Sequence, residues 1–116
     1  MIAKTIYIKP LSVNGAWQGK RFKTPAYKKY ERDLLLLLPQ MTMPKAPYEI
    51  NIEVAFSSKA SDLDNILKPF LDVLQKKYGI NDKDIYKLSA VKSIIPKANE
   101  FIRFDIKKFN PLEYPF

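Results

Sequence analysis

The sequence predicts an α+β fold in which a small mixed sheet of about four strands carries two main helices, in the order β-α-β-α-β-β. Residues 48–56 alternate apolar and polar side chains, which is the period of a half-buried strand. Residues 64–78 instead place apolar side chains three and four positions apart, which is the period of an amphipathic helix. With 116 residues, 47% of them hydrophobic, the chain has the size and the core of a single domain over residues 1–116.

The first helix is predicted over residues 25–38. Thr24 suits its N-cap, Pro25 suits its first position because a proline there loses no hydrogen bond, and Pro39 stops the run. The helix ends in five consecutive leucines, which cover more of its circumference than one buried face requires. We therefore expect it to pack on two sides, and a subunit interface is one way to supply the second side.

Strands are also predicted near both ends of the chain. Residues 2–8 alternate in the manner of a strand until Pro10 ends the run. After the second helix, which Gly79 suits as a C-cap, residues 85–95 and 101–106 have the composition of two further strands. Because only a short turn separates these two strands, they predict a hairpin, and we expect both helices to cover one face of the sheet.

The chain contains neither histidine nor cysteine. The missing cysteines exclude disulfides, thiolate zinc sites, iron–sulfur clusters and a cysteine nucleophile. The missing histidines exclude a Ser-His-Asp triad, histidine-ligated metals and a histidine general base. Hydrolytic chemistry must therefore depend on carboxylates, lysines or a hard cation. Apolar runs fall well short of the roughly 20 residues that span a bilayer, and no signal-peptide core is present, so we expect an intracellular protein without a membrane partner.

The charge balance points to a polyanionic partner, and nucleic acid is the first candidate. The formal net charge is +8, with 20 basic against 12 acidic residues. Residues 17–32 hold six basic residues and one acidic residue, which gives this stretch a net +5. Aromatic residues lie among them, and for Tyr27 and Tyr30 we leave open whether they stack on exposed bases or pack into the core. The candidate DNA-binding residues are Lys20, Arg21, Lys23, Lys28, Lys29 and Arg32, with Asn14 in the preceding polar loop.

Five aspartates gather between residues 61 and 84 of this basic chain: Asp62, Asp64, Asp72, Asp82 and Asp84. Asp62 and Asp64 can converge on one ion only where the chain is extended or just entering the helix, because residues two apart do not share a helix face. Carboxylates are hard ligands of the kind that Mg²⁺ or Mn²⁺ takes, and Asp82 or Asp84 could add a third. A calcium loop of the EF-hand type does not fit, since Leu67 stands where that loop needs glycine.

Lys68 lies four positions after Asp64 and four before Asp72, so a carboxylate precedes and follows it by one helical turn. One interpretation is an ordinary intrahelical ion pair worth a few tenths of a kcal/mol. The other is a cation that stabilises charge on a phosphate in the transition state. Pro69 predicts a local backbone distortion, because a proline cannot donate the hydrogen bond that a helix needs. Spacing alone leaves both interpretations of Lys68 open.

These residues resemble the RusA family of Holliday-junction resolvases, small basic endodeoxyribonucleases common in prophages. The resemblance depends on DLDNILKPFLDVL, a following glycine, an acidic turn and a strand that ends in Lys92. It depends more weakly on PLSVNGAWQGKRFKTPAYKKYERDL near the N-terminus. The resemblance implies that Asp62, Asp64 and Asp82 bind the metal and that Lys68 is catalytic.

Three further residues have implied supporting roles: Asn65, Asp72 and Asp84. Asp72 would orient Lys68. The acidic turn departs from the paired acids usual in the family, because it has the order Asn81-Asp82-Lys83-Asp84. Alignment through Lys92 selects Asp82 as the third metal ligand, whereas counting from Gly79 selects Asp84.

The resemblance also implies an activity and its partners. Family members act as homodimers that nick a four-way junction at two symmetry-related points, in DNA recombination and repair. The expected cofactor is Mg²⁺, with Mn²⁺ as an alternative, and the expected partner is branched DNA in the cytoplasm of a bacterial or phage-infected cell. Two alternatives stay open: a metal-dependent nuclease that acts on other branched DNA, and a non-catalytic basic DNA-binding module.

Overall fold

The computed structural model of the protein describes residues 3–12, 17–18 and 22–115. These residues form an α+β fold with a four-stranded mixed sheet and two α-helices, as the sequence predicts. Neither of these helices has the length and apolar character needed to cross a bilayer. In chain order the elements are β1 (Lys4–Ile6), β2 (Trp17–Gln18), β3 (Phe22–Lys23), α2 (Pro25–Leu37), β4 (Tyr48–Phe56), α3 (Asp64–Tyr78), the 3₁₀ helix η1 (Asp82–Asp84), β5 (Ile85–Ile94), β6 (Phe101–Lys108) and the 3₁₀ helix η2 (Pro111–Glu113).

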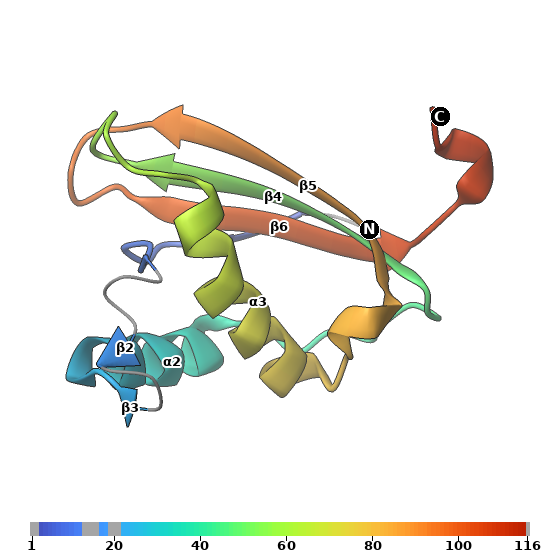
Figure 1. Ribbon diagram of the computed structural model, residues 1–116, viewed down its shortest axis with the longest axis horizontal. Coiled ribbons are helices and arrows are strands. Elements are labelled where there is room, and N and C mark those ends of the chain that lie inside the picture. The colour runs from blue at the N-terminus through green and yellow to red at the C-terminus, as the bar shows by residue number, and fades with distance from the viewer. Residues whose placement is uncertain (1–2, 13–16, 19–21, 116) are drawn as a thin grey trace.

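The sheet has the strand order β1-β6-β4-β5, with β6 antiparallel to both neighbours and β5 parallel to β4. The predicted hairpin between residues 85–95 and 101–106 is therefore wrong, because β4 lies between β5 and β6 (Figure 1). Ile50 and Val54 of β4 have no exposed surface. The apolar side chains of this strand are best buried in the centre of the sheet, where both strand edges are paired. β5 takes the edge, and its Leu88 remains 42% exposed.

Both helices cover the same face of the sheet, as predicted, and the core lies between the two layers (Figure 1). Phe70 of α3 packs against Phe104 of β6 in an edge-to-face arrangement with ring centroids 5.5 Å apart. Leu34 and Leu38, in the last turn of α2 and just after it, are also buried, whereas Leu36 is 79% exposed. The run of leucines thus buries one face of the helix and leaves another in solvent.

The helix ends follow the predicted caps. Thr24 caps α2 by accepting a hydrogen bond from the backbone N–H of Tyr27 at 3.1 Å. Gly79 ends α3 in the left-handed conformation with φ of +67°, and its N–H donates to the carbonyl of Gln75. This turn sends the chain from α3 into η1, which carries Asp82.

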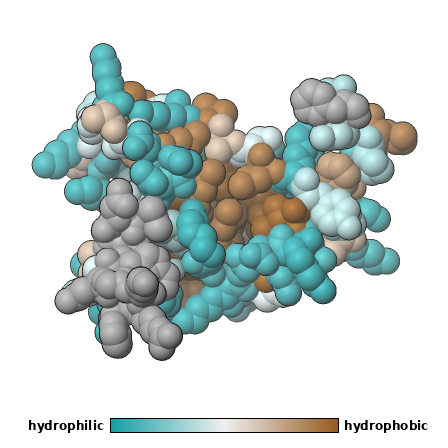
Figure 2. All heavy atoms as spheres, in the orientation of Figure 1, coloured by the Kyte–Doolittle hydropathy of each residue, from teal (hydrophilic) through white to brown (hydrophobic). Residues whose placement is uncertain are grey.

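Figure 2 shows apolar side chains gathered in the middle of one face of the molecule, between α3 and β5, with hydrophilic side chains around them. Leu67 and Leu71 of α3 and Ile85 of β5 are only partly buried against the core. The layer between helix and sheet is therefore not fully covered on the side of the edge strand.

Candidate active site

The three predicted metal ligands lie near the two ends of α3. Asp62 follows the loop after β4, and the helix begins at Asp64. Leu63, between them, already has helical backbone angles of φ −62° and ψ −44°, so Asp62 and Asp64 do not share a face. Both aspartates are exposed, and Asp62 Oδ2 accepts a hydrogen bond from Asn65 Nδ2 at 3.4 Å. Asp82 lies in η1, beyond the other end of the helix (Figure 1).

Lys68 lies on the exposed side of α3 and is paired with Asp72. Its Nζ atom donates to Asp72 Oδ1 at 2.8 Å, which confirms the predicted contact across one helical turn. The hydrogen bond to Asp72 raises the pKa of Lys68, and the charge of Asp82 adds to the effect. Asp82 is thus close enough to influence Lys68 electrostatically. Lys68 is therefore held as a cation with carboxylates from two elements near it.

Pro69 follows Lys68 inside α3, and its side chain is buried. Because a proline has no N–H, this position cannot donate to the carbonyl of Asn65 as a helical residue would. The helix nevertheless continues to Tyr78, so the missing hydrogen bond does not interrupt it.

The described residues contain no group of three or more acidic side chains arranged to hold a metal ion. The backbone turns Asp62 away from Asp64, and Asp82 follows the opposite end of α3. Mg²⁺ does not need such a cage, because it keeps several waters and is held by one or two carboxylates together with substrate phosphates. The exposed carboxylates of Asp62, Asp64 and Asp82 therefore fit this cation by their chemistry. Asp84, the alternative third ligand, is less exposed than Asp82 in the same turn.

A second lysine, Lys92 of β5, holds the loop that carries Asp62. Its Nζ atom donates to the carbonyl oxygen of Lys59 at 2.8 Å and to that of Ser61. The ammonium group also lies 5.7 Å from the ring centroid of Phe56, the last residue of β4. Sequence reasoning gave Lys92 no role, because its partners are backbone carbonyls 33 and 31 residues away that no motif marks.

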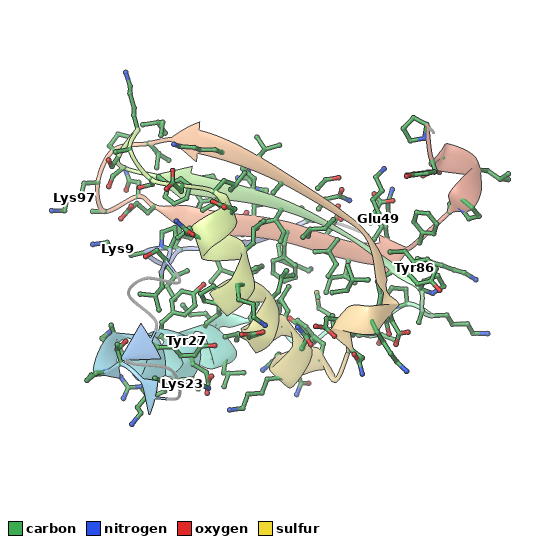
Figure 3. The ribbon with its side chains drawn as sticks, in the orientation of Figure 1. Lys9, Lys23, Tyr27, Glu49, Tyr86 and Lys97 are labelled. Carbon is green, nitrogen blue, oxygen red and sulfur yellow. The ribbon has the colours of Figure 1, made fainter. Side chains whose placement is uncertain are left out.

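Glu31 docks the basic segment around α2 onto α3. Its carboxylate accepts hydrogen bonds from Lys76 Nζ of α3 at 2.8 Å and from Lys23 Nζ at 2.9 Å. These bonds, from Lys76 first and then from Lys23, lower the pKa of Glu31. Lys23 also lies over the ring of Tyr27, 4.7 Å from its centroid (Figure 3). Lys23, a candidate phosphate contact, is thus already held by neighbours within the protein.

The other described candidates for DNA binding lie on the exposed side of α2. Lys28, Lys29 and Arg32 are all exposed. Lys29 and Arg32 pair with Asp33 at 2.7 and 3.5 Å, and such surface pairs are weak enough to be replaced by contacts with phosphate. Three further candidates lie outside the described residues: Asn14, Lys20 and Arg21.

Tyr27 and Tyr30 pack into the protein and do not offer their rings to bases. Only 1% and 5% of their surfaces are exposed, so core packing is the correct one of the two interpretations left open for them. Burial raises the pKa of Tyr27 to about 12, with smaller contributions from the charges of Asp72 and Glu31. Tyr27 therefore lies where the basic segment meets the helix that carries Lys68.

The comparison with known protein families agrees with this arrangement. The family model described as Endodeoxyribonuclease RusA matches residues 12–103, which is most of the chain. The chain belongs to the RusA endodeoxyribonuclease family. No curated protein matches the sequence. The matched range includes α2, α3, η1 and β5, and with them every candidate site residue.

Membership in the RusA family supports endodeoxyribonuclease activity and, in general terms, a function in the resolution of Holliday junctions. In this RusA-family protein the basic segment and the acid-bearing helix adjoin, because Glu31 of α2 binds Lys76 of α3. A nuclease needs that proximity, since the residues that hold the DNA backbone must place a phosphate beside the residues that cut it.

Proposed function

We propose that this RusA-family protein is a Mg²⁺-dependent, structure-specific endodeoxyribonuclease that resolves Holliday junctions by paired nicks in DNA recombination and repair. The observation that carries the proposal is Lys68, whose ammonium group lies 2.8 Å from Asp72 and within the electrostatic reach of Asp82. A phosphodiester hydrolase uses a fixed cation beside acidic metal ligands, whereas a module that only binds DNA has no need of one.

Each residue has a role in this proposal. Asp62, Asp64 and Asp82 would hold the metal, Mg²⁺ or alternatively Mn²⁺, through one or two of their carboxylates together with the substrate phosphate. When bound, the metal would supply Lewis acidity toward the phosphate and would lower the pKa of a water molecule. Lys68 keeps its proton and places its positive charge where negative charge develops on the phosphate. Asp72 fixes the direction of that ammonium group through their hydrogen bond.

The basic segment supplies affinity for the DNA backbone. The exposed side chains of Lys28, Lys29 and Arg32 suit contacts with phosphates, which release counterions and depend strongly on salt. Asn14, Lys20 and Arg21 belong to the same proposal. Because Glu31 ties α2 to Lys76, a strand bound along α2 is directed toward α3.

Branched DNA cut at two symmetric points needs two copies of the site, so we propose a homodimer. Leu36 and Leu37 support this view, because they remain 79% and 50% exposed although they belong to a run of leucines. Replacing both with serine is expected to convert dimer into monomer in analytical ultracentrifugation without loss of helix content in circular dichroism. A wild-type protein that sediments as a monomer at assay concentrations would contradict the homodimer.

Labelled four-way, forked and linear DNA, each incubated with Mg²⁺ or with EDTA, tests the activity. We expect symmetric nicks in the four-way junction only with Mg²⁺. Asp64→Asn is expected to keep junction binding and to lose cleavage by at least about 100-fold, as for other lost charge-stabilising groups. Asp105→Asn, on the opposite face of the sheet, is the matched control and should cleave normally.

Other outcomes would select one of the alternatives. Preferential cleavage of forks would indicate a nuclease for other branched DNA. Binding without cleavage of any substrate would indicate a basic DNA-binding module. Undiminished cleavage by Asp64→Asn would contradict the assigned site.

A further inference from the structure

A cleft of about 520 Å³ opens at the end of the sheet where β4 and β5 end. Its walls come from residues 9–12, from the loop of residues 57–62 before α3, from the first turn of α3 and from Glu100 just before β6. Asp62 and Asn65 line the cleft, so it adjoins the candidate active site. Figure 3 shows Lys9 at this end of the molecule. Apart from Asp62, no described residue that has a role in the proposed function lines this cleft.

The lining combines apolar surface with hydroxyl groups. Pro10 and Leu11, which are half-buried, supply accessible apolar surface, while Phe56 and Ile66 contribute little because each is only 3% exposed. Ser58 and Ser61 add hydroxyls that can donate or accept a hydrogen bond. A nucleobase fits such a mixture, because its flat faces contact apolar side chains while its edge makes hydrogen bonds.

The charges of the cleft favour a base in its interior over a phosphate. Glu100 lines it, and its carboxylate would repel a phosphate group, whereas Asp62 is assigned to the metal at the edge of the cleft. Lys9 is the one basic residue among the described lining residues, and its side chain is exposed. A nucleotide with its uncharged base inside the cleft and its phosphate toward Lys9 keeps the phosphate away from the carboxylate and close to the ammonium group.

The loop wall of the cleft is fixed before any ligand binds. The backbone N–H and the hydroxyl of Ser57 donate to Glu100 Oε2 at 3.1 and 3.0 Å. Lys92 holds the other part of the loop through the carbonyls of Lys59 and Ser61. A preformed wall costs little ordering entropy on binding, which is typical of a ligand site.

We infer that this cleft takes up one unstacked nucleotide of the strand that is cut, next to the scissile phosphate. A volume of about 520 Å³ falls within the roughly 300–1,000 Å³ of ordinary small-ligand sites. Bases are easiest to unstack where pairing is already interrupted, as at a branch point. The inference rests on the proposed function, because it states where that nuclease holds the strand beside Asp62.

The test uses the full chain and a four-way junction with 2-aminopurine, a base whose fluorescence rises when it is unstacked, beside the cleavage site. Binding is followed in EDTA, so that no strand is cut. Ala60→Phe fills the cleft, and Ala3→Phe, at an exposed position among residues of the other sheet face, is the matched control. We expect fluorescence to rise with the wild type and with Ala3→Phe but not with Ala60→Phe. Cleavage by Ala60→Phe should fall about 100-fold in kcat/KM, the usual cost of a misplaced substrate.

A second measurement needs no variant of the protein. An abasic analogue at the same nucleotide removes the base and is expected to weaken binding of the wild-type protein in EDTA by about tenfold, the loss of one stacked base. If the wild type cuts the junction but Ala60→Phe unstacks and cuts equally well, or if the abasic junction binds equally well, the inference is overturned and the proposed function stands. If the wild type never cuts the junction, but raises the fluorescence of 2-aminopurine and binds the abasic junction more weakly, the nucleotide-binding role of the cleft is supported and the proposed nuclease activity is contradicted.

Discussion

The ammonium nitrogen of Lys68 lies 2.8 Å from Oδ1 of Asp72, one turn further along α3. This hydrogen bond is the largest cause of the raised pKa of Lys68, and it also fixes the direction of a side chain that is otherwise 63% exposed. A flexible lysine would sample many rotamers, whereas this one is held toward Asp72 and within the electrostatic reach of Asp82. The pair therefore combines charge retention with orientation.

Asp72→Asn is expected to lower the pKa of Lys68 toward the ordinary lysine value of about 10.4. A raised pKa keeps the cation charged as pH rises, so losing Asp72 should move the alkaline decline of cleavage to lower pH. Cleavage near neutral pH should fall about tenfold, because orientation is lost while charge is kept. NMR titration of the Lys68 side chain and a pH–rate profile measure the two effects. Asp33→Asn, which removes the similarly spaced Lys29–Asp33 pair, is the control and should shift neither the Lys68 titration nor the pH–rate profile. An unchanged Lys68 titration in Asp72→Asn would refute the assigned effect of Asp72 on Lys68.

Lys92→Met is expected to loosen the loop that presents Asp62, because it removes both hydrogen bonds to the carbonyls of Lys59 and Ser61. Amide hydrogen exchange in residues 57–62 should accelerate, and kcat should fall while KM for the junction changes little. Lys92→Arg should keep hydrogen exchange and kcat close to the wild-type values, since arginine can still donate to two carbonyls. Lys108→Met, an exposed lysine at the end of β6, provides the control. Exchange rates that match the wild type in Lys92→Met would show that other contacts hold this loop.

Features that depend on local spacing could be predicted from the sequence. The strand at 48–56 and the helix at 64–78 follow from periodicity alone, and the Lys68–Asp72 contact follows from their four-residue separation. The hairpin prediction failed because strand pairing depends on which strand is buried most, and that is a property of the whole sheet.

Contacts between distant segments could not be predicted. Lys92 reaches carbonyl groups of a loop more than 30 residues earlier, and carbonyl groups carry no signature in a sequence. Ser57 binds Glu100 across 43 residues, so the wall of the cleft exists only once β4 and β6 are paired. The helical angles of Leu63, which separate Asp62 from Asp64, likewise depend on how the loop enters α3.

Glu31→Gln is expected to destabilise the protein by about 1 kcal/mol at neutral pH, a modest value because its partners Lys23 and Lys76 are partly in water. The lowered pKa of Glu31 sets the pH dependence. Its contribution is present above the ordinary glutamate pKa of about 4.3 and is lost as pH falls through the lowered value in the folded state. The free energies of unfolding of the wild type and Glu31→Gln, measured with urea, should therefore become equal in acid. Asp33→Asn, which loses more exposed pairs, should change stability less, and a Glu31→Gln difference that persists unchanged in acid would contradict an electrostatic cause.

Gly79→Ala is expected to destabilise the protein by about 1 kcal/mol, because an alanine pays the steric penalty of the left-handed conformation that φ of +67° requires. No heavy atom lies within 4 Å of the position that the added Cβ would take, so the cost comes from the backbone and not from a clash. Gly79→Asn should cost less, since asparagine adopts this conformation more readily. Urea unfolding at neutral pH measures all three proteins. Equal losses for alanine and asparagine would point to a role for the glycine other than its backbone angle, and a stability unchanged by alanine would mean that the turn into η1 can re-form without it.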